Sequence, residues 1–301
     1  MFSWKIWLSP YRGMPKEIYV IFVARIINAL GCFVMPLLTI ILTQNIGLSK
    51  QMTGLYISIS GLLNVPAALI GGKLADTIGR KKVIMLFDGL AIVFYITAGL
   101  MKPSLSMAYV LMIAGACMVT AGPAHDALIA DLSTPQTRNG AYALSYMGWN
   151  IGFSIGPIMG GILYRNHLPL LFIGDALTAL IALTLIGYFI PETLWKTKLA
   201  VTEPSRLEKR EEGSILAVLL KRPILLYSSI IMMGYNFAYA QWSFMLPMQT
   251  IQNFPGAGAE YFGYIAAFNG LVVMLFTPII LKITEQISNM RRMVCGGSFM
   301  P

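Results

Sequence analysis

The chain has 301 residues, of which 56% are hydrophobic and 12% are charged. Soluble domains carry about 25% charged residues, so this composition excludes a soluble globular protein. Apolar runs of about 20 residues, the length that crosses a bilayer as a helix, recur along the sequence. We therefore expect an all-α, multi-spanning membrane protein whose surface contacts the lipid bilayer.

The net charge of +9 does not indicate nucleic-acid binding. Membrane proteins concentrate Lys and Arg in cytoplasmic loops, which makes a whole chain basic, and the sequence lacks basic patches interleaved with aromatic residues. The three cysteines, Cys32, Cys117 and Cys295, lie in apolar runs without the spacing of metal ligands. Walker loops, nucleophile triads and metal clusters are also absent, so we expect neither an enzyme nor a bound cofactor or metal.

The apolar runs predict eight membrane-spanning helices, at residues 17–43, 53–75, 83–101, 107–128, 141–163, 168–190, 223–248 and 261–283. A ninth helix is expected to begin near Met293. The predicted loops place 18 of the 22 Lys and Arg residues on the side of the N-terminus and three on the other side. Because positive charge marks the cytoplasmic side, we expect a multi-pass protein of the inner cell membrane with a cytoplasmic N-terminus.

Residues 191–222 differ from the other connections because they are long, polar and charged with both signs. They form either a flexible cytoplasmic linker or an amphipathic helix on the inner membrane surface. We expect them to separate a six-helix bundle at residues 1–190 from an incomplete second half at residues 223–301.

The connection between the second and third helices has the sequence GGKLADTIGRKK, residues 71–82. Gly79 suits a tight turn with positive φ, and Asp76 and Arg80 are placed to pair across it. The ordered pattern resembles the loop signature of the major facilitator superfamily, although Thr77 stands where the family often has arginine. The resemblance implies a conformational role for this loop. Its candidate residues are Gly72, Asp76, Gly79, Arg80 and Lys81.

The fifth predicted helix contains GWNIGFSIGPIMGGIL, in which glycines from Gly148 to Gly160 repeat every four residues. They lie on one helix face and let a second helix approach closely, and Pro157 is expected to bend the helix. The pattern resembles the fifth-helix signature of the drug:proton antiporter branch of the superfamily. The residues that match are Gly152, Gly156, Pro157, Gly160 and Gly161.

Residues 127–144 resemble the connection between the fourth and fifth helices of the family, with Asp131 and Arg138 in place. In the family, the acid at this position and the arginine of the 71–82 loop belong to an ionic cluster at the inner face. The resemblance therefore implies that Arg80 lies near Asp131.

Charges at membrane depth are costly and are candidates for function. Arg25 lies about 12 Å into the first helix, in a segment that resembles the family's first helix. Asp126 lies near the inner end of the fourth helix, beside His125. We expect an Arg25–Asp126 pair, direct or through water, with Asp126 at the membrane interface as the alternative. Asp126 is the predicted proton-coupling residue, and His125 is either its helper or bonded to a backbone carbonyl.

Two further acids lie in predicted helices. Asp88 is on the third helix, which is peripheral in the family, and is expected to support the inner ionic cluster. Asp175 follows Gly174 and is expected to cap a local helix break or to titrate.

Uncharged polar and aromatic residues are expected to line a central cavity for bulky, weakly polar or cationic compounds. These candidates are Asn64, Trp149, Asn150, Tyr235, Asn236, Tyr239, Gln241 and Asn269. Trp242 belongs either to this wall or to the aromatic belt at the membrane surface.

Members of the family have twelve helices in two halves. This chain supplies eight and the start of a ninth, so we expect a truncated product. The resemblance implies a secondary transporter that exports small organic compounds in exchange for protons by alternating access. A nutrient uptake symporter and a non-transporting remnant are the alternatives, and the oligomeric state is left open.

Overall fold

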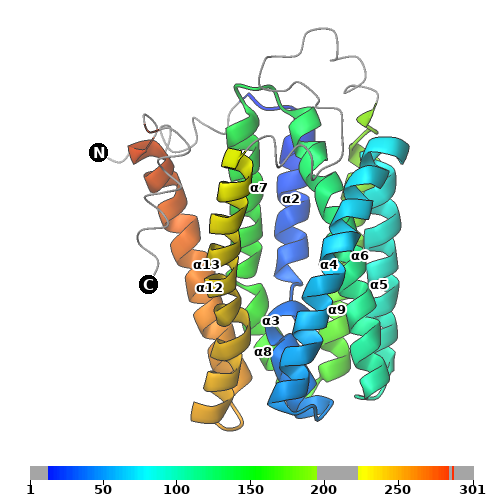
Figure 1. Cartoon of the computed structure of the whole chain (residues 1–301), viewed down its shortest axis with the longest axis vertical. Helices are drawn as coiled ribbons and strands as arrows, with labels where there is room; N and C mark the ends of the chain where they lie inside the picture. The colour runs from blue at the N-terminus through cyan, green and yellow to red at the C-terminus, as the bar shows by residue number, and fades with distance from the viewer. Residues whose placement is uncertain (1–12, 195–222, 285–286, 288–301) are drawn as a thin grey trace.

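The computed structural model describes residues 13–194, 223–284 and 287. Within these residues the chain forms helices joined by short connections and contains no strand, which confirms the predicted all-α class there. The helices run side by side along the long axis of the molecule (Figure 1). Most of the predicted 191–222 linker and the predicted start of a ninth helix lie outside the described residues.

The helices occupy the predicted spans to within a few residues. Their bounds are α2 Lys16–Leu30, α3 Val34–Ile40, the π-helical turn η2 Ile41–Asn45, α4 Lys50–Ile78, α5 Arg80–Leu100, α6 Leu105–Leu132, α7 Arg138–Phe153, α8 Gly156–Asn166, α9 Leu168–Phe189, α12 Pro223–Asn253 and α13 Gly258–Ile283. Six segments of the described chain are long and apolar enough to cross a membrane. The predicted fifth span, which is divided into α7 and α8, is not among these six.

Local sequence explains where several helices begin. The Ser49 hydroxyl accepts a hydrogen bond from the Met52 N–H at 3.2 Å, and the Ser104 hydroxyl accepts one from the Met107 N–H at 3.4 Å. Both serines are N-caps, which satisfy N–H groups that have no partner inside the helix. Gly79 alone joins α4 to α5 with φ of 117°, a backbone conformation that favours glycine.

Two predicted helices are broken. The sequence indicated a bend in the fifth helix, at Pro157, but none in the first. The first helix is interrupted at Gly31–Phe33, so the prediction of one continuous helix over 17–43 was wrong. The fifth helix is interrupted at Ser154 and Ile155, just before Pro157. Proline lacks an N–H group and fits the first turn of a helix, so α8 begins around Pro157 where α7 ends.

The helices of residues 13–194 form one bundle. Within it α5 lies between α6 and α9, α2 packs against α7 and α9, and α4 covers α6. Helix α13 lies along α7 and α8, and α12 packs against α13 and α3. We call the two ends of the molecule the Gly79 end, which also holds the 133–137 connection, and the Gly47 end, which also holds the 101–104 connection.

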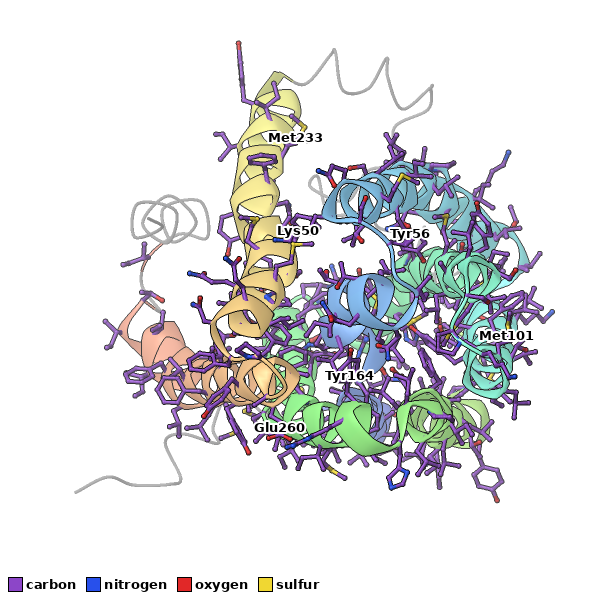
Figure 2. All side chains as sticks on the ribbon, turned by 90° about the horizontal axis from the view of Figure 1, so that it is seen from below. Lys50, Tyr56, Met101, Tyr164, Met233 and Glu260 are labelled. Atoms are coloured by element: carbon purple, nitrogen blue, oxygen red, sulfur yellow. The ribbon has the colours of Figure 1, made fainter. Side chains whose placement is uncertain are left out.

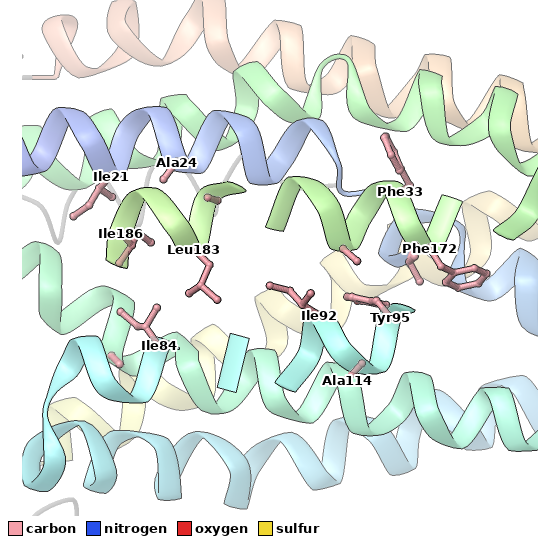
Figure 3. Close-up of a cluster of buried hydrophobic side chains, with 14 of the residues drawn as sticks. Ile21, Ala24, Phe33, Ile84, Ile92, Tyr95, Ala114, Phe172, Leu183 and Ile186 are labelled. Carbon is pink, nitrogen blue, oxygen red and sulfur yellow. The ribbon is translucent and has the colours of Figure 1, made fainter. Parts of the chain in front are cut away.

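The apolar core of the bundle lies between α2, α5, α6 and α9. In Figure 3, Leu183 of α9 and Ile92 and Tyr95 of α5 point into the space that α2 closes with Ile21 and Ala24. These side chains are at least nine-tenths buried. They also surround the cavity described below, so the core and the candidate site share walls.

Among the described side chains of α12, those that are buried lie toward the Gly47 end. There the Thr39 hydroxyl donates to the Ser243 carbonyl at 3.3 Å, joining α3 to α12. Toward the Gly79 end the described side chains from Tyr227 to Tyr239 are exposed, with Met233 at 72%. Figure 2, viewed from the Gly47 end, shows this part of α12 reaching away from the bundle.

Candidate functional site

An ionic cluster lies at the Gly79 end and is centred on Arg80. The Arg80 guanidinium is 3.0 Å from the Asp131 carboxylate and 3.2 Å from the Asp76 carboxylate, and it donates to the Ala75 carbonyl at 2.8 Å. The structure thus places Arg80 beside Asp131, as the family resemblance implied. The Arg80 side chain is 6% exposed and that of Asp131 13%, so the pair is largely enclosed.

Two residues of this Arg80 cluster were missed by sequence reasoning. The Glu192 carboxylate accepts hydrogen bonds from the N–H groups of Arg80 at 2.9 Å and Lys82 at 3.4 Å. It therefore caps the N-terminus of α5, where a negative charge is favourable. The Thr193 hydroxyl donates to Asp131 at 2.7 Å. The signal was the acid directly after Pro191, at the end of the sixth predicted helix.

The other residues predicted in these motifs lie at the same end. Lys81 is in the first turn of α5, and Arg138 begins α7. The close approach of α4 to α6 occurs at Gly71, where a Cβ would meet the Thr120 carbonyl. Gly72 has ordinary room, with the nearest side-chain atom of Pro123 3.8 Å from an ideal Cβ.

A cavity of about 260 Å³ lies inside the bundle, between α2, α5, α6, α7 and α9. We call it the charged cavity because one guanidinium, one imidazole and three carboxylates reach its wall, from Arg25, His125, Asp88, Asp126 and Asp175. Trp149 of α7 also lies on the wall, and Figure 3 shows six of the core residues that line it: Ile21, Ala24, Ile92, Tyr95, Leu183 and Ile186. The five residues that carry the guanidinium, imidazole and carboxylate groups were all predicted from the sequence as candidates for charge or coupling.

Asp88 does not belong to the Arg80 cluster, which corrects the prediction of a supporting contact there. It lies eight residues beyond Arg80 on α5, which is about 12 Å along the helix. Instead the His125 Nε2 is 2.8 Å from the Asp88 carboxylate, a contact that joins α6 to α5. The prediction of His125 as a helper of Asp126 or a partner of a backbone carbonyl is replaced by this pair.

Arg25 and Asp126 share the cavity but do not form the predicted direct ion pair. Among the described residues no carboxylate oxygen lies within 4 Å of the Arg25 guanidinium, although Asp126 and Asp88 act on it electrostatically. Asp126 is exposed, and it follows His125 on a helix that turns about 100° per residue. The two neighbours on α6 therefore point in different directions.

Asp175 holds the break in the first helix. Its carboxylate accepts hydrogen bonds from the N–H groups of Phe33 at 3.3 Å and Val34 at 3.1 Å. Asp175 is 6% exposed and lies on α9, so the break that it caps is in a different helix from its own. The prediction that Asp175 caps a local break was therefore wrong, because α9 is continuous from Leu168 to Phe189 and the capped break lies in the first helix.

The glycines of the fifth helix bring α7 and α8 against α2. A Cβ at Gly148 would lie 2.8 Å from the Phe22 carbonyl, one at Gly152 would meet the Ile26 carbonyl, and one at Gly156 would lie 2.6 Å from the Ala29 carbonyl. Gly160 is also tight, against Phe33. Side chains would separate these helices because the atoms that they would meet are mostly backbone.

The opposite side of the same helix carries α13. A Cβ at Gly161 would lie 2.9 Å from the Ala259 carbonyl, and one at Gly263 would lie 2.5 Å from the Pro157 carbonyl. Gly270 approaches Ser154 in the same way. Gly263 and Gly270 were missed by sequence reasoning, and their seven-residue spacing on one helix face was the available signal. Helices α7 and α8 thus form the interface between the rest of the bundle and α13.

Aromatic rings run from the exposed part of α12 to the wall of the charged cavity. Tyr235 stacks on Tyr239 at 6.5 Å between ring centroids, and Tyr239 stacks on Trp242 at 6.4 Å. Trp242 is 6.4 Å from Phe153 of α7, which stacks on Trp149 at 6.2 Å. We call these five residues the aromatic row. Trp242 lies in the middle of this row and does not line the charged cavity, and its place in an aromatic belt at the membrane surface stays a prediction.

The charged cavity is not lined by the predicted residues Asn64, Asn150, Asn236 and Asn269. The Asn150 and Asn236 amides each donate at 2.8 Å to a carbonyl of their own helix, from Tyr146 and Met232. Their place in the wall of a central cavity between the two halves stays a prediction. Asn64 is half-buried on α4, Asn269 is exposed on α13, and Gln241 lies on α12.

Comparisons with known proteins agree with this architecture. A model of the Major Facilitator Superfamily matches residues 21–300. The chain is 28% identical to a Na(+), Li(+), K(+)/H(+) antiporter of Planococcus maritimus over 83% of this chain and 64% of that protein. It is 23% identical to the multidrug resistance protein MdtH of Escherichia coli over 81% of this chain and 58% of that protein. The fold is also similar to the crystal structure of a peptide transporter POT in complex with sulfate, with a TM-score of 0.66, 17% identity, and coverage of 92% of this chain and 70% of that one.

The chain thus spans less than two thirds of the length of these two curated relatives. The names of the relatives are those of transporters, in agreement with the prediction that the chain is not an enzyme. With its helices in the predicted membrane spans and a family model that covers nearly all of its residues, the chain belongs to the major facilitator superfamily.

Proposed function

We propose that the protein is a secondary transporter that exports small organic compounds in exchange for protons by alternating access. The names of the relatives support this direction, because one is an antiporter that uses protons and another is a multidrug resistance protein. The proton gradient would drive export, and no other cofactor is needed. The protein would lie in the cell membrane with the Gly79 end in the cytoplasm, because Lys73, Arg80, Lys81 and Lys82 are at that end.

The aromatic row is the observation that carries the proposal. It crosses from α12 to α7, and so joins the two parts of the chain that alternating access would move relative to each other. Tyr235 and Tyr239 are exposed toward the Gly79 end, whereas Trp149 lines the charged cavity. Stacked rings attract flat and cationic compounds with little demand on their exact shape. A path of this kind suits an exporter of varied organic compounds.

The exposed part of α12 fits one state of the proposed cycle. Helix α12 contacts the bundle toward the Gly47 end and leaves it toward the Gly79 end. With the proposed orientation, the aromatic row would be accessible from the cytoplasm, which is the side from which an exporter takes its substrate.

Exchange of alkali cations for protons is a second candidate function. The charged cavity brings three carboxylates together with one guanidinium, which favours a positive ligand. The antiporter of Planococcus maritimus is named for such ions.

The test uses everted membrane vesicles from cells that express the protein, with a respiration-driven pH gradient followed by a fluorescent dye. Addition of ethidium is expected to dissipate the gradient, and addition of NaCl or KCl does so if the second candidate is correct. The Trp242→Ala variant should lower the ethidium response about five-fold, from the loss of roughly 1 kcal/mol of stacking and cation–π attraction. Tyr188→Ala is the matched control because Tyr188 is 82% exposed on α9, outside the aromatic row.

Three outcomes decide the proposal. A response to ethidium that Trp242→Ala weakens and Tyr188→Ala does not supports export along the row. Accumulation of a compound together with protons would replace export with the uptake symporter. A protein that inserts into the membrane but responds to no organic compound and no salt would be a non-transporting remnant.

A further inference from the structure

The Asp88–His125 pair is unlike the other ion pairs of the described chain because it faces a cavity inside the bundle. The His125 side chain is 16% exposed and that of Asp88 is 24% exposed, and both line the charged cavity. A pair that served only to tie α5 to α6 would need no access to a cavity. These two helices already pack along their lengths through apolar residues.

The groups around the pair come from every helix that has an ionisable residue on the cavity. Arg25 faces it from α2, Tyr95 from α5, Asp126 from α6 and Asp175 from α9, while α7 contributes the uncharged Trp149. Asp175 is engaged by two backbone N–H groups, whereas Arg25 has no ion pair within 4 Å among the described residues. Carboxylates thus outnumber cations on the wall, and histidine is the side chain that exchanges protons near neutral pH.

We propose that the Asp88–His125 pair holds one exchangeable proton, and that entry of a monovalent cation into the charged cavity releases it. The inference rests on the proposed function and names the proton site of the exchange. It also assigns Asp88 of α5, rather than Asp126, as the carboxylate that supports the protonated histidine.

The exchange balances in charge and in protons. The imidazolium of His125 carries a proton on each ring nitrogen, and its Nε2–H donates to Asp88. The proton that leaves is therefore the one on Nδ1, which passes to water, and the neutral ring keeps its Nε2–H bond to Asp88. One positive charge leaves the cavity as the incoming cation brings one in. Like charges at close range in a weakly polar site repel strongly, so the imidazolium and the cation compete for the same carboxylates.

The cavity limits the size of the cation. A volume of about 260 Å³ is close to the lower end of ligand pockets, which begin near 300 Å³, and admits a small organic ammonium ion or an alkali ion. Trp149 adds a ring face that attracts organic ammonium groups. A single positive charge is the chemistry that both ligands share.

The experiment measures proton release from the purified full chain in detergent, in weakly buffered solution with a pH-indicator dye. Tetraethylammonium chloride and sodium chloride are added in separate arms, with sucrose at matched osmolarity as the blank. At least one salt is expected to release close to one proton per chain from the wild type, and His125→Gln and Asp88→Asn should abolish the release. The matched control is His167→Gln, because His167 is the other of the two histidines and is exposed at the α8–α9 connection.

A second readout keeps the test independent of folding defects in the variants. With only two histidines, ¹⁵N-histidine labelling of the wild type gives two imidazole signals. The effective cation should shift the His125 signal and leave that of His167 in place. A merely structural histidine would not respond to the cation.

The outcomes separate this inference from the proposed function. Proton release that depends on His125 in a protein without transport would sustain the inference and overturn the exporter. Transport together with unchanged proton release in His125→Gln would overturn the inference and sustain the exporter. The inference is also overturned if neither salt releases a proton from the wild type or moves the His125 signal.

Discussion

The bundle contains two groups of charged residues that are built in opposite ways. In the Arg80 cluster, the guanidinium meets two carboxylates and a backbone carbonyl and is 6% exposed. In the charged cavity, the Arg25 guanidinium has no ion pair within 4 Å among the described residues and faces open space. The first arrangement satisfies its charges with the protein itself, and the second leaves the charge of Arg25 facing the cavity.

This difference separates stability from function in physical terms. Removing one partner of an enclosed ion pair leaves the other charge buried and unpaired, which costs about 3–5 kcal/mol. Removing a cavity charge that has no ion pair among the described residues, such as that of Asp126, leaves no partner stranded, so the cost in stability is small. We therefore expect substitutions in the Arg80 cluster to lower the free energy of unfolding, and substitutions at the cavity to alter exchange.

The largest effect is expected for Asp131→Ala. It removes the 3.0 Å partner of Arg80 and the acceptor of the Thr193 hydroxyl in one step. We expect a loss of about 3 kcal/mol in the free energy of unfolding, at the lower end of the range because Arg80 keeps its bond to Ala75. Denaturation in mixed micelles measures it. The matched control is Asp126→Ala, an exposed acid of the cavity whose loss should cost under about 1 kcal/mol, and equal costs for the two would erase the distinction.

Gly152→Ala tests whether the cavity can be disturbed without touching the Arg80 cluster. The new methyl group would meet the backbone of Ile26 and Leu30 on α2, the helix that carries Arg25. We expect about 2 kcal/mol of destabilisation, because backbone cannot move aside cheaply, together with reduced exchange. Gly115→Ala is the control, since no atom lies within 4 Å of its Cβ position and alanine favours the helix. A Gly152→Ala protein as stable as Gly115→Ala would show that the helix contact is not tight.

The helices could be predicted from the sequence because each is a long apolar run with a clear start, such as Ser104 before α6. The break in the first helix could not, because the group that stabilises it, Asp175, is 141 residues away from Val34 in the sequence. Gly31 marked a weak point without showing that a carboxylate from α9 would hold it open. Long-range capping of this kind leaves no local pattern.

In the candidate site, too, the residues could be predicted from the sequence but their long-range contacts could not. Arg25, Asp88, His125 and Asp126 were found because ionisable residues are rare in apolar helices. Their pairing was predicted wrongly, because it depends on how α5 and α6 are rotated about their axes, which the apolar pattern of nearly uniform helices does not fix. That Arg80 lies beside Asp131 was predicted correctly, but only because of the family resemblance. Glu192 was missed because it lies outside the matched motifs.

Asp175→Ala sharpens the comparison from inside the cavity. Asp175 lines the charged cavity, yet it behaves like a member of the enclosed group because it binds the N–H groups of Phe33 and Val34. The Phe33 N–H also donates to the Gly31 carbonyl at 2.7 Å, so the alanine variant leaves only the Val34 N–H without its acceptor. We expect a loss of about 2 kcal/mol in the free energy of unfolding. The Asp175→Asn variant keeps a side-chain oxygen as acceptor and should lose under about 1 kcal/mol. Equal stability of the two variants would mean that the helix break does not depend on this cap.

The smallest effect on stability is expected for Asp76→Asn. Asp76 is the exposed member of the Arg80 cluster, with 68% of its side chain accessible, so its ion pair contributes about 0–1 kcal/mol. We nevertheless expect slower exchange with normal insertion into the membrane, because a conformational switch is biased by differences of this size between its two states. Vesicle flux and the unfolding transition are measured on the same preparation. Normal flux would mean that the Arg80 cluster contributes to stability alone. Slow flux in a stable protein would show that Asp76 takes part in transport.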